Sequence, residues 1–232
     1  HLISSSVPGD DAIELVKGLS DNILFTIAFL DMCKVCDVKR VVFVSSSSVY
    51  GLQAQIPIAE SATTNPISSH GIEKLALEKY LLLYKFLHGI DVRIIRLSNP
   101  FGPGQSLFGR QGFIAIATGH LLKHESILLR DLGRPIRDFI YIDDVVECWF
   151  RASKSNSCLN LCMNIGTGIP TKVKRLISII RKKIPETKYY LSRPTKGDQN
   201  FIVGDNNLLR SKLNIKKFLS VEEGLELFIS SL

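Results

Sequence analysis

Two strand patterns separated by one helix pattern constrain the fold of this chain more than any other feature. Residues 41–44 (VVFV) and 91–97 (DVRIIRL) are short β-branched and apolar runs of the kind found in strands buried on both faces. Between them, residues 69–87 have apolar positions at helical spacing, and Gly89 stands where a helix would stop. A strand, a helix and a strand in this order predict parallel strands joined by a helical crossover.

The flanking segments extend this pattern in both directions. A helix is expected over 21–37, a second near 112–123 and a third from Asp143, followed by a strand at LCMNI, a basic helix and two short final helices. We therefore expect an α/β fold, a doubly wound parallel sheet with a smaller mixed α/β C-terminal lobe. Ligands in such sheets bind beyond the carboxyl ends of the strands, which points to the loops SSSSVYG and SNPFGPGQ.

The cysteines favour a reducing compartment. Five cysteines form an odd set without the density of a small disulfide framework, and a cytoplasmic location is expected. Cys33 and Cys36 make a CxxC, but no second pair lies nearby, so the apolar helix pattern around them is favoured over a zinc or redox site and no metal is expected. No apolar run reaches the roughly 18 residues of a membrane-spanning helix, and no secretory signal is visible.

The net charge of +7 permits several anionic partners, including nucleic acid. The densest basic segment, TKVKRLISIIRKKIPETK, places its apolar residues on one helical stripe and its lysines and arginines on the other. This pattern is typical of a surface helix packed by one face. No recognition motif or aromatic stacking platform accompanies the charge, so no nucleic-acid partner is expected.

His70 and Lys74 stand one helical turn apart at the start of the 69–87 helix. Side chains four apart share a helix face, so these two could act on one bound molecule. A His and a Lys on a helix are also common on a solvated face, and the pair alone does not decide between the two readings.

Five motifs together carry a family resemblance. VVFVSSSSVYG, HGIEK, RLSNPFGPGQ, RDFIYIDDVV and NIGTG occur in this order along the chain. In order and spacing they resemble the NAD-dependent epimerase/dehydratase family of extended short-chain dehydrogenase/reductases, and most of all its UDP-glucose 4-epimerase branch. The resemblance implies a Rossmann-like sheet and an NAD-dependent nucleotide-sugar epimerase of surface polysaccharide synthesis acting on a UDP-hexose. The alternative is a catalytically impaired, truncated remnant or a nucleotide-sugar-binding pseudoenzyme.

The resemblance also implies a division of the chain. Residues 1–105 would be the remainder of the NAD-binding domain with the catalytic motif, and 106–232 the substrate lobe, with chain exchange between them. Family members open with a GxxGxxG turn at a helix N-terminus that binds the NAD pyrophosphate. This turn is not found here, and HLISSS looks like the end of a later strand, so we expect an N-terminally truncated sheet and weak or absent NAD binding.

Site residues follow from the motifs by position. The family's catalytic set of Ser or Thr, Tyr and Lys corresponds to Ser46, His70 and Lys74, with histidine in the tyrosine's place. Histidine can act as a general base near neutral pH, but its ring ends short of a phenol oxygen, and a neighbouring ammonium disfavours the imidazolium. The resemblance assigns cofactor contacts to Asn22, Ser45 and Lys74.

Substrate contacts are implied at three positions. Asn99 and Arg137 match the family's asparagine and arginine that hold the nucleotide-sugar diphosphate, and Arg193 resembles a second phosphate arginine at a longer spacing. The plainer alternatives are a loop cap for Asn99 and, for Arg137, a salt bridge with Asp138 or Asp143. Arginine suits the role because its planar fork binds phosphate oxygens bidentately.

Two further expectations follow. Dehydratase and decarboxylase relatives carry carboxyl groups after the catalytic Ser or Thr, whereas this chain has Ser47 and Ser48, so elimination is disfavoured. Family members often dimerise through the two long helices that correspond to 21–37 and 70–87, and the apolar content of these segments permits a homodimer.

Overall fold

The computed structural model describes residues 1–2, 18–158, 161–182, 184–193 and 201–232. Its central sheet contains β1 (Arg40–Ser46), β2 (Asp91–Leu97) and β7 (Cys162–Ile165) in the order β1-β2-β7. Both pairings are parallel, with Val41 opposite Val92 and Ile95 opposite Met163. The parallel α/β sheet expected from the two buried strand patterns is therefore confirmed.

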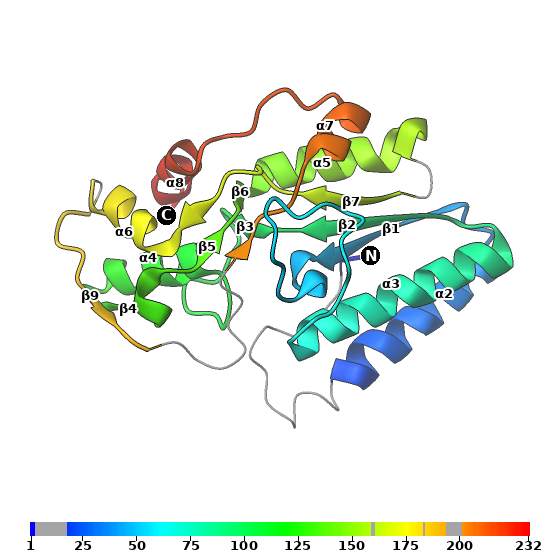
Figure 1. Cartoon of the computed structure of the whole chain (residues 1–232), viewed down its shortest axis with the longest axis horizontal. Helices are drawn as coiled ribbons and strands as arrows, with labels where there is room; N and C mark the ends of the chain where they lie inside the picture. Colours follow the sequence, from blue (N-terminus) through cyan, green and yellow to red (C-terminus); the bar gives the residue numbers. More distant parts are fainter. Residues whose placement is uncertain (3–17, 159–160, 183, 194–200) are drawn as a thin grey trace.

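Helices cover both faces of this sheet (Figure 1). One core joins α2 (Phe25–Val35) and α3 (Ser69–His88) to Val41 and Phe43 of β1. Val42 points the other way and belongs to a core with α5 (Ile142–Lys154) and α7 (Asn207–Leu213). Because strand side chains alternate between faces, one continuous apolar run supplies both cores.

The long helix α3 begins and ends on local signals. The Ser68 hydroxyl accepts a hydrogen bond of 3.2 Å from the Gly71 N–H, and so caps the first turn. Gly89 takes the left-handed conformation, with φ +70°, and its N–H bonds to the Lys85 carbonyl. The predicted helix over 69–87 is confirmed.

The helix expected over 21–37 differs from the prediction at both ends. Its first part, η1 (Leu19–Leu24), is a π-helix, and α2 follows it directly. Asp37 adopts a left-handed φ of 52°, which stops α2 early. Within η1, Asn22 is buried and its carbonyl accepts a hydrogen bond of 2.6 Å from Thr26. π-Helical turns are rare in proteins, and those that do occur often lie at functional sites.

The remaining elements are shorter than α3, and several of them build a third core at the left of Figure 1. The strands are β3 (Asn99–Phe101), β4 (Ile127–Leu129), β5 (Ile136–Arg137), β6 (Phe139–Tyr141), β8 (Thr171–Lys172), β9 (Tyr189–Leu191) and β10 (Phe201–Ile202). The helices are α4 (Phe113–Leu122), α6 (Val173–Arg181) and α8 (Val221–Ser230), with 3₁₀ turns η2 (Ser47–Tyr50), η3 (Arg130–Gly133) and η4 (Asn156–Cys158). The small sheets pair β3 with β6, β4 with β9, and β5 with β10 and β8.

Elements from beyond residue 105 thus contribute to both regions. β7, α5 and α7 complete the central sheet and its second layer, whereas α4, α6 and α8 build the separate core. The division of the chain at residue 105 stays a prediction.

The cysteines are free thiols, with Cys33 buried and Cys36 exposed at the end of α2. Within the described ranges, no group of three or more metal-binding side chains comes together. Among the helices of those same ranges, none has the length and hydropathy to cross a membrane.

Candidate functional site

The end of β1 places two serines on opposite faces of the sheet. The Ser45 hydroxyl is buried and donates a hydrogen bond of 2.6 Å to Glu78 of α3. Ser46 lies where β1 passes into the turn η2, and its Oγ accepts hydrogen bonds of 3.2 Å from the Ser48 N–H and 2.9 Å from the Ser48 hydroxyl. Of the two, Ser46 is the one oriented into the loop region where ligands of such sheets bind.

The start of α3 lies directly against this turn. A Cβ atom at Gly71 would stand 2.7 Å from the Ser48 carbonyl oxygen and 2.9 Å from Pro66 Cβ. Only a glycine allows this approach, and it holds the first turn of α3, including the half-buried His70, next to the Ser46 turn.

Lys74 lies one turn further along α3 and is 5% exposed. Its Nζ donates a hydrogen bond of 3.0 Å to the Val44 carbonyl and lies 5.0 Å from the centre of the Phe43 ring. Burial lowers the pKa of this ammonium to about 8, and the nearby Glu73 carboxylate opposes that shift. The structure therefore places His70 and Lys74 on the first turns of α3, against the end of β1 and the turn that follows it.

Asn22 lies beside the same helix. Its side-chain amide donates a buried hydrogen bond of 2.7 Å to Glu73, the neighbour of Lys74 in sequence. A Cβ at Gly18 would come within 2.3 Å of Glu73, so η1 approaches α3 closely. Asn22 is thus positioned next to the Lys74 region, and its contact with a cofactor stays a prediction.

Asn99 bonds to the residue that follows Arg137. Both the N–H and the side-chain amide of Asn99 donate to the Asp138 carbonyl, at 3.0 and 3.2 Å. Arg137 precedes that residue in β5, between β10 and β8. Asn99 in β3 pairs with Phe139 of β6, so Asp138 links the strands that carry the two predicted substrate residues.

Asp138 itself is fully buried. Its carboxylate accepts hydrogen bonds of 2.9 and 2.6 Å from the N–H and hydroxyl of Thr167, and of 2.9 Å from the Gly168 N–H. Burial raises the pKa of Asp138, and these hydrogen bonds oppose the shift. They tie the RDF motif to the NIGTG motif.

Arg193 lies apart from these hydrogen bonds. It follows β9, its side chain is exposed, and its carbonyl accepts a contact of 3.4 Å from the Ser192 hydroxyl. The next seven residues, 194–200, lie outside the described ranges. The assignment of Arg193 to a phosphate stays a prediction.

A buried polar network behind the site was not predicted from the sequence. Arg96 forms a salt bridge of 2.7 Å with Glu78, and its guanidinium lies 4.8 Å from the centre of the Tyr50 ring. The Tyr50 hydroxyl, whose pKa burial raises to about 12, donates 2.6 Å to the Asn164 side chain. A charged residue inside the apolar run DVRIIRL was the available signal, since a buried charge requires a partner.

The network joins motifs that are far apart in sequence. Asn164 of NIGTG also donates from its amide to the carbonyls of Ile58 and Asp205, at 2.9 and 3.1 Å. VYG, α3, RLSN and NIGTG are thereby held together beneath the strand ends.

Comparisons with known proteins agree with the motifs. Residues 1–166 match the NAD dependent epimerase/dehydratase family. A putative UDP-glucose 4-epimerase of Methanocaldococcus jannaschii is 34% identical over 207 residues, 88% of this chain and 67% of that protein. A UDP-glucose 4-epimerase of Mycolicibacterium smegmatis is 29% identical over 88% of this chain and 66% of its own length.

A comparison with a crystal structure shows that the fold is shared as well. UDP-glucose 4-epimerase of Thermotoga maritima, solved with UDP-glucose, superposes with a TM-score of 0.89 at 29% identity, covering 94% of this chain and 71% of that one. The chain thus spans about two thirds of the length of the curated relatives named above.

Proposed function

This chain belongs to the NAD-dependent epimerase/dehydratase family, and we propose that its site is that of a UDP-hexose 4-epimerase. The observation that supports this proposal most is the pair of hydrogen bonds from Asn99 to the carbonyl of Asp138, the residue that follows Arg137. Two relatives named for UDP-glucose match in sequence, and a structure solved with UDP-glucose shares the fold.

The substrate end of the site would hold the diphosphate. The guanidinium of Arg137 presents a planar fork of N–H donors that matches phosphate oxygens, and the Asn99 amide adds a neutral donor. Arg193 is proposed as a further phosphate contact. A sugar attached to that diphosphate would extend towards Ser46 and His70.

The donor set along α3 fits the nicotinamide half of NAD. An ammonium has three N–H donors, and Lys74 gives one to Val44, which leaves donors for a ribose hydroxyl. Asn22 and Ser45 are proposed beside it. When bound, NAD would supply the hydride acceptor. The sequence contains no GxxGxxG turn for the pyrophosphate, so we propose that this 232-residue chain binds NAD weakly.

Proton transfer would fall to Ser46 and His70. The Ser46 hydroxyl can hydrogen-bond the reacting sugar hydroxyl, and the imidazole of His70 can take its proton directly or through one water. The absence of carboxyl side chains at Ser47 and Ser48 favours epimerisation over elimination of water.

A second candidate function follows from His70. Histidine in the tyrosine's place shortens the reach of the base, which favours a nucleotide-sugar-binding protein with reduced or no turnover. The fold and the diphosphate contacts would be the same in both cases, so turnover is the discriminating observation.

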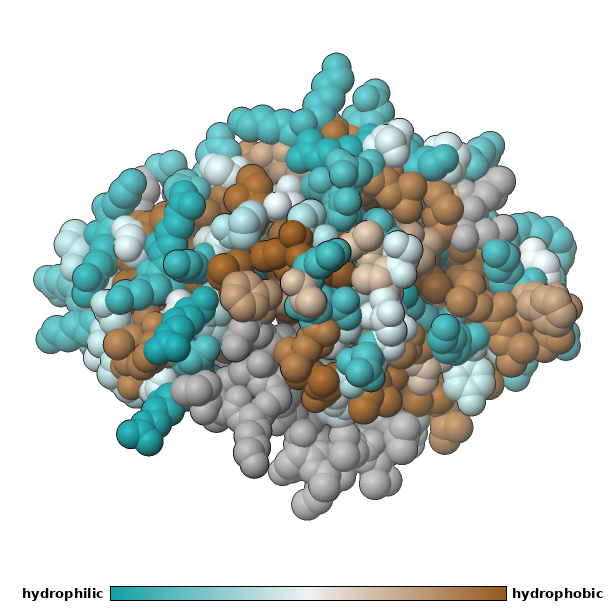
Figure 2. Space-filling model, in the orientation of Figure 1, coloured by the Kyte–Doolittle hydropathy of each residue, from teal (hydrophilic) through white to brown (hydrophobic). Residues whose placement is uncertain are grey.

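The assembly proposed is a homodimer. α2 and α3 lie side by side, linked by a hydrogen bond of 2.7 Å from Tyr84 to Asp31. Their outer faces expose Met32, Leu83 and Phe86, and Phe86 is 84% exposed. Figure 2 shows hydrophobic side chains over these helices at the right. A second copy would cover such a face symmetrically.

A cytoplasmic location and a role in surface polysaccharide synthesis are proposed together with the epimerase activity.

Calorimetric titration tests the proposal on the chain as it stands. We expect UDP-glucose to bind, with affinity that changes little between 50 and 200 mM salt, whereas backbone binding to duplex DNA would fall about 10³-fold or more over that range. Conversion of UDP-glucose to UDP-galactose with NAD in excess then separates the enzyme from the binding protein. If UDP-glucose does not bind while DNA does, the proposed function is wrong.

A further inference from the structure

We propose that Asp138 is a positioning residue for the diphosphate contact, because its buried carboxylate and its carbonyl fix Arg137 and Asn99 relative to each other. The inference rests on the proposed function, since it assumes that these two side chains hold a diphosphate. It goes beyond that function by assigning a role to a residue that would touch no ligand.

The backbone of Asp138 connects three segments. Its carbonyl accepts from the N–H and the side-chain amide of Asn99, at 3.0 and 3.2 Å. Its N–H donates to the Ile202 carbonyl of β10 at 3.2 Å. A displacement of Asp138 would therefore move Asn99 directly, and Arg137 through the peptide bond that joins it to Asp138.

The side chain of Asp138 fixes that backbone to the NIGTG loop. One carboxylate oxygen accepts from the N–H and hydroxyl of Thr167, and the other accepts from the Gly168 N–H. A Cβ at Gly166 would lie 2.2 Å from the Asp138 carboxylate and 2.6 Å from the Ser98 hydroxyl. The loop thus closes on the carboxylate with no room for a larger residue.

The arrangement separates the anchoring group from the binding group. Side chains of successive residues in an extended segment point to opposite sides, so the Asp138 carboxylate enters the interior while the Arg137 guanidinium, which is half-buried, is directed away from it. The partners of the carboxylate in the described part of the chain are neutral N–H and O–H groups. The role proposed for Asp138 therefore needs no ion pair with an arginine.

Asp138→Asn tests this role with little change in volume. An amide in place of the carboxylate turns an N–H₂ towards either Thr167 or Gly168, and one loop hydrogen bond is lost. Asp143→Asn is the matched control, since it removes the same charge from an exposed position five residues along.

Affinity is measured by calorimetry for UDP-glucose and for uridine, which has no phosphate. We expect Asp138→Asn to weaken UDP-glucose binding about tenfold, the scale of one hydrogen bond, while uridine affinity stays the same. Thr167→Val should weaken UDP-glucose similarly, and Thr167→Ser, which keeps the hydroxyl, should bind as the parent does. Asp143→Asn should change neither ligand.

Asp138→Asn combined with Arg137→Ala shows whether the loss of UDP-glucose affinity acts through the Arg137 guanidinium. We expect Asp138→Asn to add little further loss there, because the guanidinium it positions is gone. An equal added loss in both backgrounds, or equal losses for uridine and UDP-glucose, would mean that Asp138 acts only on overall structure. If Asp138→Asn does not fold, the Thr167→Val and Thr167→Ser pair decides, and equal affinity of the two overturns the inference.

The same set distinguishes the inference from the function it rests on. Arg137→Ala alone tests the diphosphate assignment. If that variant binds UDP-glucose normally, the proposed function is at fault. If it binds weakly while Asp138→Asn binds normally, only the positioning role is wrong.

Discussion

The ammonium of Lys74 is buried against β1, where it donates a hydrogen bond of 3.0 Å to the Val44 carbonyl. Its pKa falls from 10.5 to about 8 because burial disfavours the charged form. Burying this charge lowers the free energy of unfolding, and buried charges of this kind are typical of functional sites. The loss in stability can be measured.

Lys74→Met should therefore stabilise the protein by about 1–3 kcal/mol at pH 7. Below the folded-state pKa the lysine is charged in both states, so the full cost is present. As pH rises from about 8 towards 10.5 the folded state releases its proton first, and the cost fades. Urea unfolding at pH 7 and pH 10 should show a gain that is smaller at pH 10.

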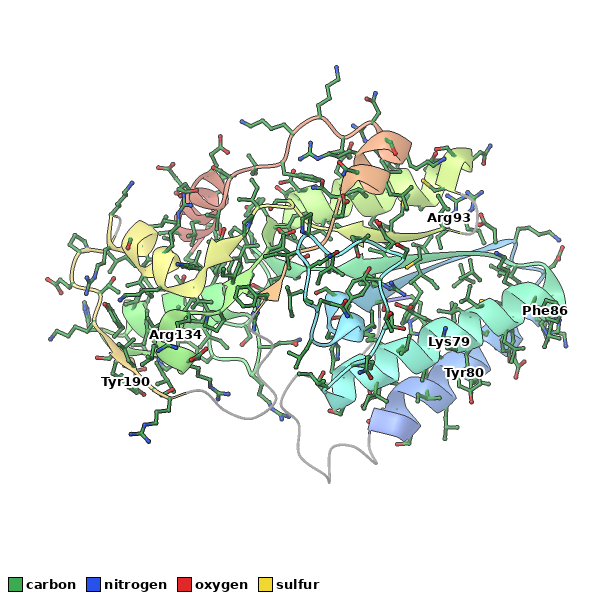
Figure 3. The ribbon with its side chains drawn as sticks, in the orientation of Figure 1. Lys79, Tyr80, Phe86, Arg93, Arg134 and Tyr190 are labelled. Atoms are coloured by element: carbon green, nitrogen blue, oxygen red, sulfur yellow. The ribbon has the colours of Figure 1, made fainter. Side chains whose placement is uncertain are left out.

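The control is Lys79→Met on the same helix. Lys79 is exposed and is labelled in Figure 3. We expect a change within about 0.5 kcal/mol at either pH, as for other surface positions. A destabilised Lys74→Met variant at pH 7 would contradict the burial cost.

His70→Tyr should raise epimerase turnover by about 10²–10⁴-fold, the usual value of a positioned acid–base group. The phenol oxygen extends further from the helix than the imidazole, towards Ser46 and the sugar hydroxyl. Lys74 supplies the adjacent positive charge. Conversion of UDP-glucose is followed from pH 6 to 9 with NAD in excess, and in a fusion that places a family member's GxxGxxG units before residue 1.

Lys74→Ala in the His70→Tyr background should abolish the gain. A parent chain that already turns over as fast as His70→Tyr would show that histidine is a competent base, and the binding-protein alternative would then fall.

Arg137→Ala should weaken UDP-glucose binding more than Arg193→Ala does. A charge-assisted hydrogen bond contributes about 1.5–3 kcal/mol, which corresponds to roughly 10- to 150-fold in affinity. Arg137 precedes Asp138, whose carbonyl binds Asn99, whereas Arg193 lies in an exposed segment. Calorimetry on both variants makes the comparison, and a larger loss from Arg193→Ala would move the diphosphate contact to the other arginine.

Breaking the Glu78–Arg96 pair should cost more than removing both partners. Glu78→Gln or Arg96→Met alone leaves an unpaired group in a site that is less than one tenth exposed, which typically costs about 3–5 kcal/mol. The double variant removes both charges and should be less destabilised than the sum of the singles. Urea unfolding of all four proteins gives the coupling, and additive losses would show that the two charges do not interact.

Phe86→Glu combined with Leu83→Glu should convert the proposed dimer to a monomer, because two charges would enter an apolar contact. Light scattering after size exclusion measures the mass. Tyr190→Glu is the control, since Tyr190 is 56% exposed on β9, at the far side of the molecule in Figure 3. A parent chain that is monomeric at micromolar concentration would refute the dimer.

The sequence predicted the long elements well. The runs at β1 and β2 and the stop at Gly89 are local signals, and each agrees with the structure. Strands β5 and β8, with two residues each, were not predicted because two residues carry no periodicity. Their existence depends on pairing with distant segments.

The candidate site was predictable only in part. Motif position assigns Ser46, His70 and Lys74 to one site, and this assignment stays a prediction. The anchoring roles of Asp138 and Glu78 depend on partners 29 and 18 residues away, and no spacing rule identifies which donor meets a given carboxylate. The sequence indicated that buried charges exist, and the fold supplied their partners.

The anchoring of Asn99 and Arg137 at one buried aspartate has a consequence for how such proteins diverge. The anchor lies in the interior, whereas the neighbouring loop between Gly102 and Gly112 is largely exposed and holds Phe108 at 57% exposure. Substitutions in that loop can therefore accumulate without disturbing the proposed diphosphate contact. An ancestral protein of this construction could exchange one sugar for another while keeping its nucleotide, so new substrates would be reached through a series of intermediates that all still bind.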